Sequence, residues 1–455
     1  MREDHASQRG PDVAVRRHRL ERGIKLLLDH QDTFAKAMSA DYGNRSIYQS
    51  ITIDVAQSVA ALRHAHARLE AWLQPELAEV PNREMKAWIV RQPLGLVGIV
   101  SSWQFPLHEV FGPLAGVLAA GNAALLKPSE LTPRTSDLLA EMVPHYFDAM
   151  EVAVVLGGPE IGAAVCALPL DHLVFTGSAD AGRQVMRAAA EHLVPVTLAL
   201  GGKTPVLFDQ RADVVAAAER LLTGKTFNAG QYVGAPDLVM MTADQVDPFI
   251  VAALSYVWRS YPTLLSNADY TSIISDWHFD RLLAIIDDAK AKGAKVLHLG
   301  PEREQPHDRG TRIIAPTLLL DVNDRMRAMK EELGGPILAI KVVASQAAAF
   351  DCLSRWKHAP AGYFFGPSTD SQFDFSEKIV SGAVVINDVM CQTFLETVPL
   401  GGLGSSGFGA YHGVHGFQRF SHAKPVIVQG DDGASNMRLR TPYDDKLIGL
   451  KATMG

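Results

Sequence analysis

Cysteine is scarce in this sequence: Cys166, Cys352 and Cys391 are the only three among 455 residues. Three widely spaced thiols exclude a disulfide framework and a zinc ribbon, and they suit a reducing cytosol. Long apolar runs are lacking as well. The most apolar stretch, 95–102, is shorter than the roughly 20 residues of a membrane-spanning helix, and residues 1–10 contain no apolar signal core. We therefore expect a cytoplasmic protein without a membrane anchor.

Basic residues are also fewer than acidic residues. The chain has 43 basic and 50 acidic residues, a formal net charge of −7. This balance argues against nucleic acid or an anionic membrane as the main partner. An apolar fraction of 47% with 20% charged residues excludes wholesale disorder. The length accommodates about two to three domains of ~150 residues and a large core.

Short apolar strands alternate with helical segments along most of the chain. Strands are predicted at 95–101, 123–128, 151–156 and 172–176, after two helical segments at 13–40 and 51–72. A second series of strands is predicted at 205–208, 238–241 and 383–387. Apolar strands separated by helices are typical of doubly wound α/β sheets. Two further segments, 85–91 and 424–429, alternate like edge strands, and we expect them to pair as an oligomerisation arm.

Two short segments have the composition of a nucleotide site. Phe175 to Ser178 follows a predicted strand and opens a helix over 179–190, where a helix N-terminus favours a phosphate. Lys127 to Glu130 follows another strand, where a lysine and a glutamate can bind ribose hydroxyls or a phosphate. Taken alone, the first segment is more typical of a structural glycine turn, and the second is as compatible with a solvated charge pair as with a ligand site.

Motifs distributed over nearly the whole chain resemble the aldehyde dehydrogenase superfamily, and most of all its coniferyl aldehyde dehydrogenase branch. They occur in the order typical of the family, at 41–46, 92–99, 119–123, 125–130, 175–178, 200–203, 228–231, 235–237, 315–317, 331–332, 386–388, 406–407, 409–413, 416–417 and 420–422. The resemblance implies an α/β fold with a Rossmann-like cofactor domain, an α/β catalytic domain and a β-ribbon oligomerisation arm.

The same resemblance implies how the chain is divided. Residues 1–200 would form the dinucleotide-binding domain, with 81–92 part of the oligomerisation arm. Residues 201–390 would form the catalytic-type α/β domain. Residues 391–455 would return to the cofactor domain and supply the C-terminal oligomerisation strand.

The implied cofactor is NAD or NADP. By resemblance, the residues lining the dinucleotide would be Trp103, Lys127, Glu130, Gly177, Ser178 and Glu332, the last reaching the nicotinamide ribose. Glu130 favours the free ribose hydroxyls of NAD, whereas Lys127 is able to accept the 2′-phosphate of NADP. No metal site is expected.

The three groups that the family's chemistry needs are replaced. That chemistry uses a cysteine thiolate as nucleophile, a glutamate as general base, and an asparagine side-chain amide together with a backbone N–H to hold the oxyanion. At the matching positions of the motifs, Val233 replaces the nucleophile, Ala199 replaces the base and Gln104 replaces the asparagine. Valine offers no lone pair and alanine takes no proton. Glutamine keeps the amide on an arm one methylene longer.

Other departures surround these positions. Gly334 stands where a phenylalanine beside the nicotinamide is expected, and Leu400 replaces a phenylalanine of the substrate tunnel. Tyr232 is larger than the usual small residue. Cys391 lies in a loop that borders the tunnel in the family, so we assign Tyr232, Cys391 and Leu400 to the substrate pocket.

Three functions are compatible with this pattern. The chain is either a dehydrogenase-like protein inactive in NAD(P)-dependent aldehyde oxidation, a repurposed enzyme with noncovalent chemistry, or a dehydrogenase with an unusual nucleophile such as Cys391. A small-molecule ligand fits all three. By resemblance, the chain would form a homodimer or a dimer of dimers, or a heteromer with an active homologue.

Overall fold

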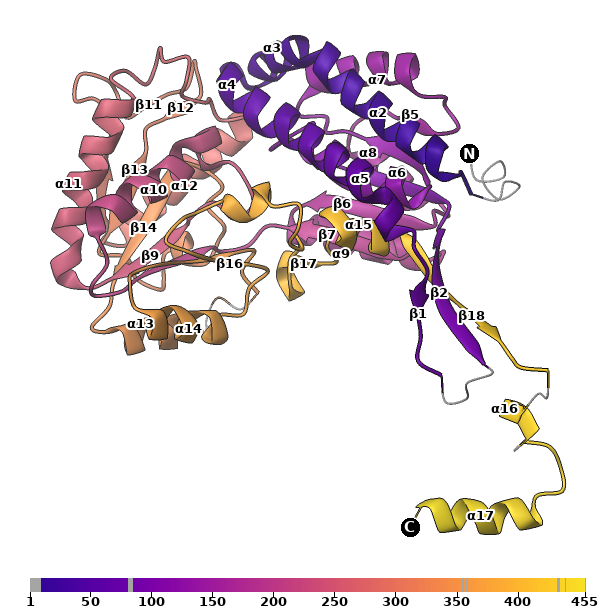
Figure 1. Ribbon diagram of the computed structural model, residues 1–455. Coiled ribbons are helices and arrows are strands. Elements are labelled where there is room, and N and C mark those ends of the chain that lie inside the picture. The colour runs from indigo at the N-terminus through magenta and orange to yellow at the C-terminus, as the bar shows by residue number, and fades with distance from the viewer. Residues whose placement is uncertain are drawn as a thin grey trace.

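The chain folds into two α/β units with a β-ribbon extending from one of them (Figure 1). The computed structural model describes residues 10–80, 85–353, 356, 358–431, 434–437 and 439–454. Residues 1–9 and 81–84, which the sequence assigns to the first domain and to the arm, lie outside the described residues.

A six-stranded sheet forms the centre of the first unit, in the order β17-β7-β6-β3-β4-β5. Its strands are β3 (Leu96–Val100), β4 (Ala123–Lys127), β5 (Val152–Val154), β6 (His172–Gly177), β7 (Val196–Leu200) and β17 (Gly407–Phe408). The first five are parallel, and β17 joins antiparallel to β7. The four strands predicted here from apolar runs are confirmed, because parallel strands covered by helices are apolar on both faces.

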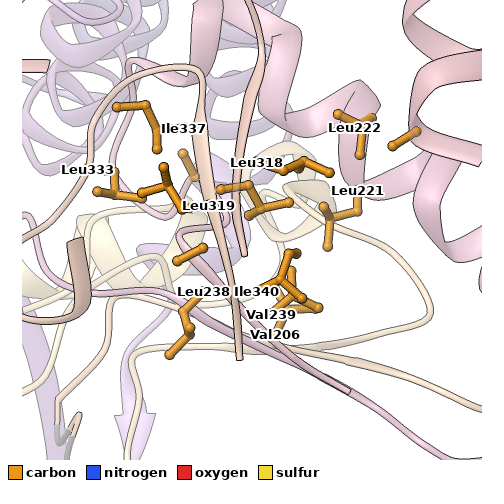
Figure 2. Close-up of a cluster of buried hydrophobic side chains, with 14 of the residues drawn as sticks. Val206, Leu221, Leu222, Leu238, Val239, Leu318, Leu319, Leu333, Ile337 and Ile340 are labelled. Carbon is orange, nitrogen blue, oxygen red and sulfur yellow. The ribbon is translucent and has the colours of Figure 1, made fainter. Parts of the chain in front are cut away.

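The second unit is built on a seven-stranded sheet, in the order β10-β13-β14-β9-β8-β15-β16. Its strands are β8 (Pro205–Phe208), β9 (Leu238–Met241), β10 (Lys295–His298), β13 (Thr317–Leu320), β14 (Ile337–Val342), β15 (Gly362–Phe365) and β16 (Val384–Ile386). Helices α10 (Val214–Thr226), α11 (Ala243–Ser260), α12 (Asp276–Ala291), α13 (Gln346–Leu353) and α14 (Thr369–Lys378) accompany it. Leucine, isoleucine and valine side chains from the strands, from α10 and from the loop before β14 make up part of its core (Figure 2).

The N-terminal helices depart from the sequence prediction at two breaks. The predicted segment 13–40 is two helices, α2 (Val13–Asp29) and α3 (Gln31–Tyr42), separated at His30. The predicted segment 51–72 begins as a π-helix, η1 (Ser50–Gln57), and continues as α5 (Ser58–Trp72). The other helices described in this unit are α4 (Ile47–Gln49), α6 (His108–Ala120), α7 (Pro133–Tyr146), α8 (Pro159–Cys166), α9 (Ala179–Ala190) and α15 (Gly413–Arg419).

The β-ribbon joins segments that are far apart in the sequence. Strand β2 (Lys86–Pro93) pairs with β1 (Glu76–Leu77) and with β18 (Ser421–Val428), so the predicted pairing of the two edge segments is confirmed. Helix α17 (Asp444–Met454) lies beyond the tip of this ribbon (Figure 1). Among the described residues, no helix is both long and apolar enough to cross a membrane.

Candidate functional site

A cavity is bordered by residues from both units. Its walls come from the turn before α6, from β7, from the turn at 232–234 and from the loop at 390–402. The empty space is about 960 Å³, its opening to solvent included. Most of the lining residues are apolar, which suits a small organic ligand.

Val233 lies in this cavity on a turn with unusual backbone geometry. The preceding residues Asn228, Ala229 and Gly230 have φ angles of 48°, 51° and 70°, all in the left-handed region. Non-glycine residues adopt this region only where their surroundings hold them there. The backbone N–H of Asn228 donates to Gln49 Oε1 at 2.9 Å, and its side-chain amide donates to the carbonyl of Gln104 at 3.1 Å. The turn that carries the nucleophile position is therefore firmly anchored.

Gln104 is bonded directly to the nucleophile position. Its side-chain oxygen Oε1 accepts the backbone N–H of Val233 at 2.9 Å. Because only the oxygen of the amide accepts a backbone N–H, the Nε2 group of Gln104 must face away from that N–H. The backbone of Gln104 is held by the Tyr42 hydroxyl, which donates to its carbonyl at 3.1 Å. The backbone donor expected to bind an oxyanion is thus already occupied within the protein.

Ala199 lines the same cavity from strand β7, where it pairs with Gly407 of β17. The structure therefore brings Val233, Ala199 and Gln104, which the sequence separates by up to 129 positions, to one cavity.

Of the three residues predicted for the substrate pocket, two line the cavity and Cys391 is not among the described lining residues. Tyr232 and Leu400 both line the cavity. The Tyr232 hydroxyl donates to the carbonyl of Gly224 at 2.8 Å, and burial raises the pKa of Tyr232 well above its ordinary value. Cys391 is not among the described lining residues, although its neighbours Met390 and Gln392 are, and it packs against the core of the second unit. Burial, with the nearby Asp388, raises the pKa of the Cys391 thiol, which disfavours the thiolate.

Glu109 is a lining residue that the motif comparison did not single out. It lies in the first turn of α6, is 7% exposed, and its Oε2 accepts the backbone N–H of Ser102 at 2.8 Å. Burial is the main cause that raises the pKa of Glu109 to about 7. The sequence alone could have drawn attention to Glu109, since it is the only acidic residue in the mostly apolar helix His108–Ala120.

Four of the six residues assigned to the dinucleotide form two groups at the carboxyl ends of strands. The Lys127 ammonium is buried and bonds to Glu130 at 2.7 Å just beyond β4. Ser178 is the N-cap of α9, where its hydroxyl accepts the N–H of Ala181, and Gly177 ends β6. A cation, a carboxylate and a capped helix N-terminus are groups that suit a ribose and a pyrophosphate.

Glu332 and Trp103 lie at the interface between the two units. A β-carbon on Gly201 would be 1.8 Å from Glu332 Oε2, so the carboxyl group rests directly on this glycine. Burial and the nearby Asp237 raise the pKa of Glu332 to about 8. The Trp103 ring contacts His278 of α12 edge-on, with ring centroids 4.9 Å apart. Beside Glu332, the backbone of Gly334 has a φ of 55°, a conformation that favours glycine at this position.

Comparison with known proteins gives one consistent result. The sequence pattern of the aldehyde dehydrogenase family matches residues 4–426. The chain is 46% identical over 454 residues to coniferyl aldehyde dehydrogenase of Pseudomonas sp. (strain HR199 / DSM 7063), covering 100% of this chain and 94% of that protein. It is 44% identical to a probable coniferyl aldehyde dehydrogenase of Caulobacter vibrioides, covering 96% of this chain and 91% of the relative.

Solved structures agree with the sequence comparison. The substrate-bound state of Staphylococcus aureus AldH superposes with a TM-score of 0.91 at 30% identity, covering 100% of this chain and 97% of the other. Indole-3-acetaldehyde dehydrogenase complexed with NAD+ has the same fold, with a TM-score of 0.86 at 23% identity, covering 94% and 87% of the two chains. The chain therefore belongs to the aldehyde dehydrogenase family.

Proposed function

We propose that this chain binds an aldehyde-class ligand noncovalently in the apolar cavity and does not oxidise it through a thioester. One observation carries the proposal: Val233 and Ala199 line the same cavity, and Gln104 occupies the N–H of Val233. An aromatic ligand suits the lining rings of Phe105 and Tyr411. Aromatic aldehydes also correspond to the name of the relative from Pseudomonas sp..

The proposal follows from what each position is able to do. Val233 has no nucleophilic atom, so no hemithioacetal forms there. Ala199 has no group that deprotonates water for thioester hydrolysis. The N–H of Val233 is occupied by Gln104 Oε1, and the loss of one oxyanion donor costs about 3 kcal/mol in related chemistry. Once the nucleophile is missing, the other two substitutions add little further cost.

A dinucleotide fits the polar groups at the carboxyl ends of the strands. We assign Lys127, Glu130 and Ser178 to its ribose and phosphate groups, and Glu332 to its second ribose, with NAD or NADP both accommodated. When bound, the dinucleotide supplies a hydride acceptor or donor. The chain's own residues bind and orient it, and the half-buried Trp103–His278 pair lies at the interface between the two units.

Calorimetric titration with NAD and NADP, followed by coniferyl aldehyde, tests the proposal. We expect binding of a dinucleotide and of the aldehyde, with no NADH or NADPH formation above a protein-free blank. The coniferyl aldehyde dehydrogenase of Pseudomonas sp., assayed in parallel, is the positive control. Aldehyde-dependent NADH formation that iodoacetamide abolishes would overturn the proposal, as would the absence of aldehyde binding.

We also propose that the β-ribbon mediates assembly into a dimer or a dimer of dimers, or with an active homologue. Among the described strands, β18 is an outer strand of the ribbon, and its Ile427 is 64% exposed. Open strand edges invite pairing with another chain. Light scattering should give the mass of an oligomer, and the variant Ile427→Asp should shift it toward the 49.3 kDa monomer. An unchanged mass would exclude this contact.

A further inference from the structure

We propose that Glu109 is a general base in the cavity and that the protein catalyses the reversible addition of water to the carbonyl carbon of an aldehyde. The proposal rests on the noncovalent aldehyde site proposed above and adds a reaction to it. Ala199 is unable to accept a proton. The proposal gives that role to the carboxyl group of Glu109, which lies on another wall of the same cavity.

The position of Glu109 carries this inference. Among the described residues that line the cavity, Glu109 is the only one with a carboxyl group. One oxygen, Oε2, is fixed by the N–H of Ser102 at 2.8 Å, which holds the side chain in one orientation. Ser102 also accepts the N–H of Gln104 through its hydroxyl at 3.3 Å. One short turn therefore connects a proton acceptor to the backbone of Gln104, and the side-chain Nε2 group of Gln104 can donate a hydrogen bond to a carbonyl oxygen.

The surroundings of Glu109 favour proton exchange near neutral pH. Burial raises its pKa to about 7, the Ser102 contact opposes this shift, and Asp54 of η1 adds to it. The other titratable neighbours are uncharged at this pH. Burial lowers the pKa of His108 to about 3, and burial together with Glu109 raises the pKa of Tyr411 far above neutrality. A base whose pKa lies near the working pH is the most effective for proton transfer.

The proposed step balances with water as the only co-reactant. The water oxygen forms a bond to the carbonyl carbon while one water proton passes to the Glu109 carboxylate. The π electrons of the C=O bond move to the carbonyl oxygen, which accepts a hydrogen bond from Gln104 Nε2. The protonated Glu109 then returns its proton to that oxygen, and a gem-diol results. No electron is lost or gained, and the reverse sequence regenerates the aldehyde.

Exchange of oxygen between benzaldehyde and H2(18)O, followed by mass spectrometry, measures this reaction without any dinucleotide. We expect the protein to accelerate exchange, with a pH profile that rises with a midpoint near 7 as Glu109 ionises. The variant Glu109→Gln should lower the protein-dependent rate by about 100-fold or more. Its amide oxygen still accepts the N–H of Ser102, so the turn and the binding of benzaldehyde should persist.

A matched variant separates this role from a general effect of buried acids. Burial also raises the pKa of Glu396 to about 7, but Glu396 is not among the described residues that line the cavity. Glu396→Gln should therefore leave the exchange rate and its pH profile unchanged. Benzaldehyde binding without accelerated exchange, or full exchange in Glu109→Gln, overturns this inference and leaves the proposed function standing. Absence of benzaldehyde binding, measured by calorimetry, overturns the proposed function itself.

Discussion

The side-chain oxygen of Gln104 accepts the backbone N–H of Val233 at 2.9 Å, and this bond occupies the backbone donor of the oxyanion site. The substitution at position 104 therefore does more than lengthen an amide arm. The amide oxygen accepts from the protein, and the Nε2 group is left to donate to a ligand. The replaced nucleophile position and the occupied backbone donor of the oxyanion site are thus joined in one contact.

Protection of the Val233 amide should depend on Gln104. Replacing Gln104 by Ala removes the acceptor, and a net hydrogen bond is worth about 1 kcal/mol. We expect the Val233 N–H to exchange with deuterium about 5-fold faster in Gln104→Ala. Hydrogen exchange read by mass spectrometry of the peptide that contains Val233 measures this. Gln392→Ala, a cavity-lining glutamine that donates to Tyr363 and not to Val233, is the control.

The thioester chemistry should be recoverable by restoring three side chains. The left-handed turn at Asn228, Ala229 and Gly230 is anchored, so a cysteine at position 233 would line the cavity on a fixed backbone. We expect the triple variant Val233→Cys, Ala199→Glu, Gln104→Asn to reduce NAD with coniferyl aldehyde. The activity should be abolished by iodoacetamide.

Single and matched variants give the controls for that experiment. Val233→Ser with the same two partners should be inactive, because a hydroxyl is a far weaker nucleophile than a thiolate. Val233→Cys alone should form little NADH, since no base hydrolyses the thioester. If the triple variant binds NAD and aldehyde but stays inactive, other residues such as Gly334 and Leu400 also block the reaction.

The fold was largely predictable because its signals are local. Apolar runs such as 123–128 are confirmed as buried parallel strands, and alternation at 85–91 and 424–429 identified a pair that the chain separates by more than 300 residues. The break at His30 was not predicted, because the apolar spacing continues through it. The orientation of the Gln104 amide was not predictable either, since it depends on where the Val233 N–H lies in three dimensions.

Cysteine reactivity separates this chain from a thiol-dependent enzyme. Burial raises the pKa of Cys166 to about 11, and burial raises the pKa of Cys391 above its ordinary value. We therefore expect both thiols to react with iodoacetamide at pH 7 more slowly than cysteine in a short peptide. Mass spectrometry of digested protein gives the two rates. A rate for Cys391 above the peptide reference would favour the unusual-nucleophile hypothesis.

A fully buried ion pair supports the turn that carries Gln104. Arg45 and Asp54 have no exposed side-chain surface and are 2.8 Å apart, while Asp54 Oδ1 accepts the N–H of Leu107 at 3.0 Å. Replacing Arg45 by Met leaves the Asp54 charge buried without its partner, so we expect a loss of about 3–5 kcal/mol in the free energy of unfolding. Urea unfolding measures it. Lys25→Met, which breaks an exposed pair with Asp29, should leave stability unchanged.

Acid stability should depend on His172. Burial, with the nearby Arg419, lowers the pKa of His172 to about 3. Thr197 Oγ1 accepts a hydrogen bond from Arg419 Nε at 3.0 Å and lies 2.9 Å from His172 Nε2. The Thr197 hydroxyl proton is therefore available to donate to His172 Nε2, and this bond favours the neutral imidazole ring. Between pH 6.5 and about 3 the unfolded chain holds this proton and the folded chain does not. The contribution of His172 to the free energy of unfolding is therefore complete above pH 6.5. It is lost as the pH falls toward 3, by about 1.4 kcal/mol per pH unit.

The variant His172→Gln isolates this contribution. Its amide oxygen can accept from the Thr197 hydroxyl but does not titrate. The loss of stability between pH 7 and pH 5 should be smaller in the variant by about 2 kcal/mol. Glu109 and Glu396, whose pKa values are raised, change stability in the opposite direction over this range, so the two proteins must be compared with each other. Urea unfolding at both pH values gives the difference, and equal losses in both proteins would show that His172 titrates normally in the folded chain.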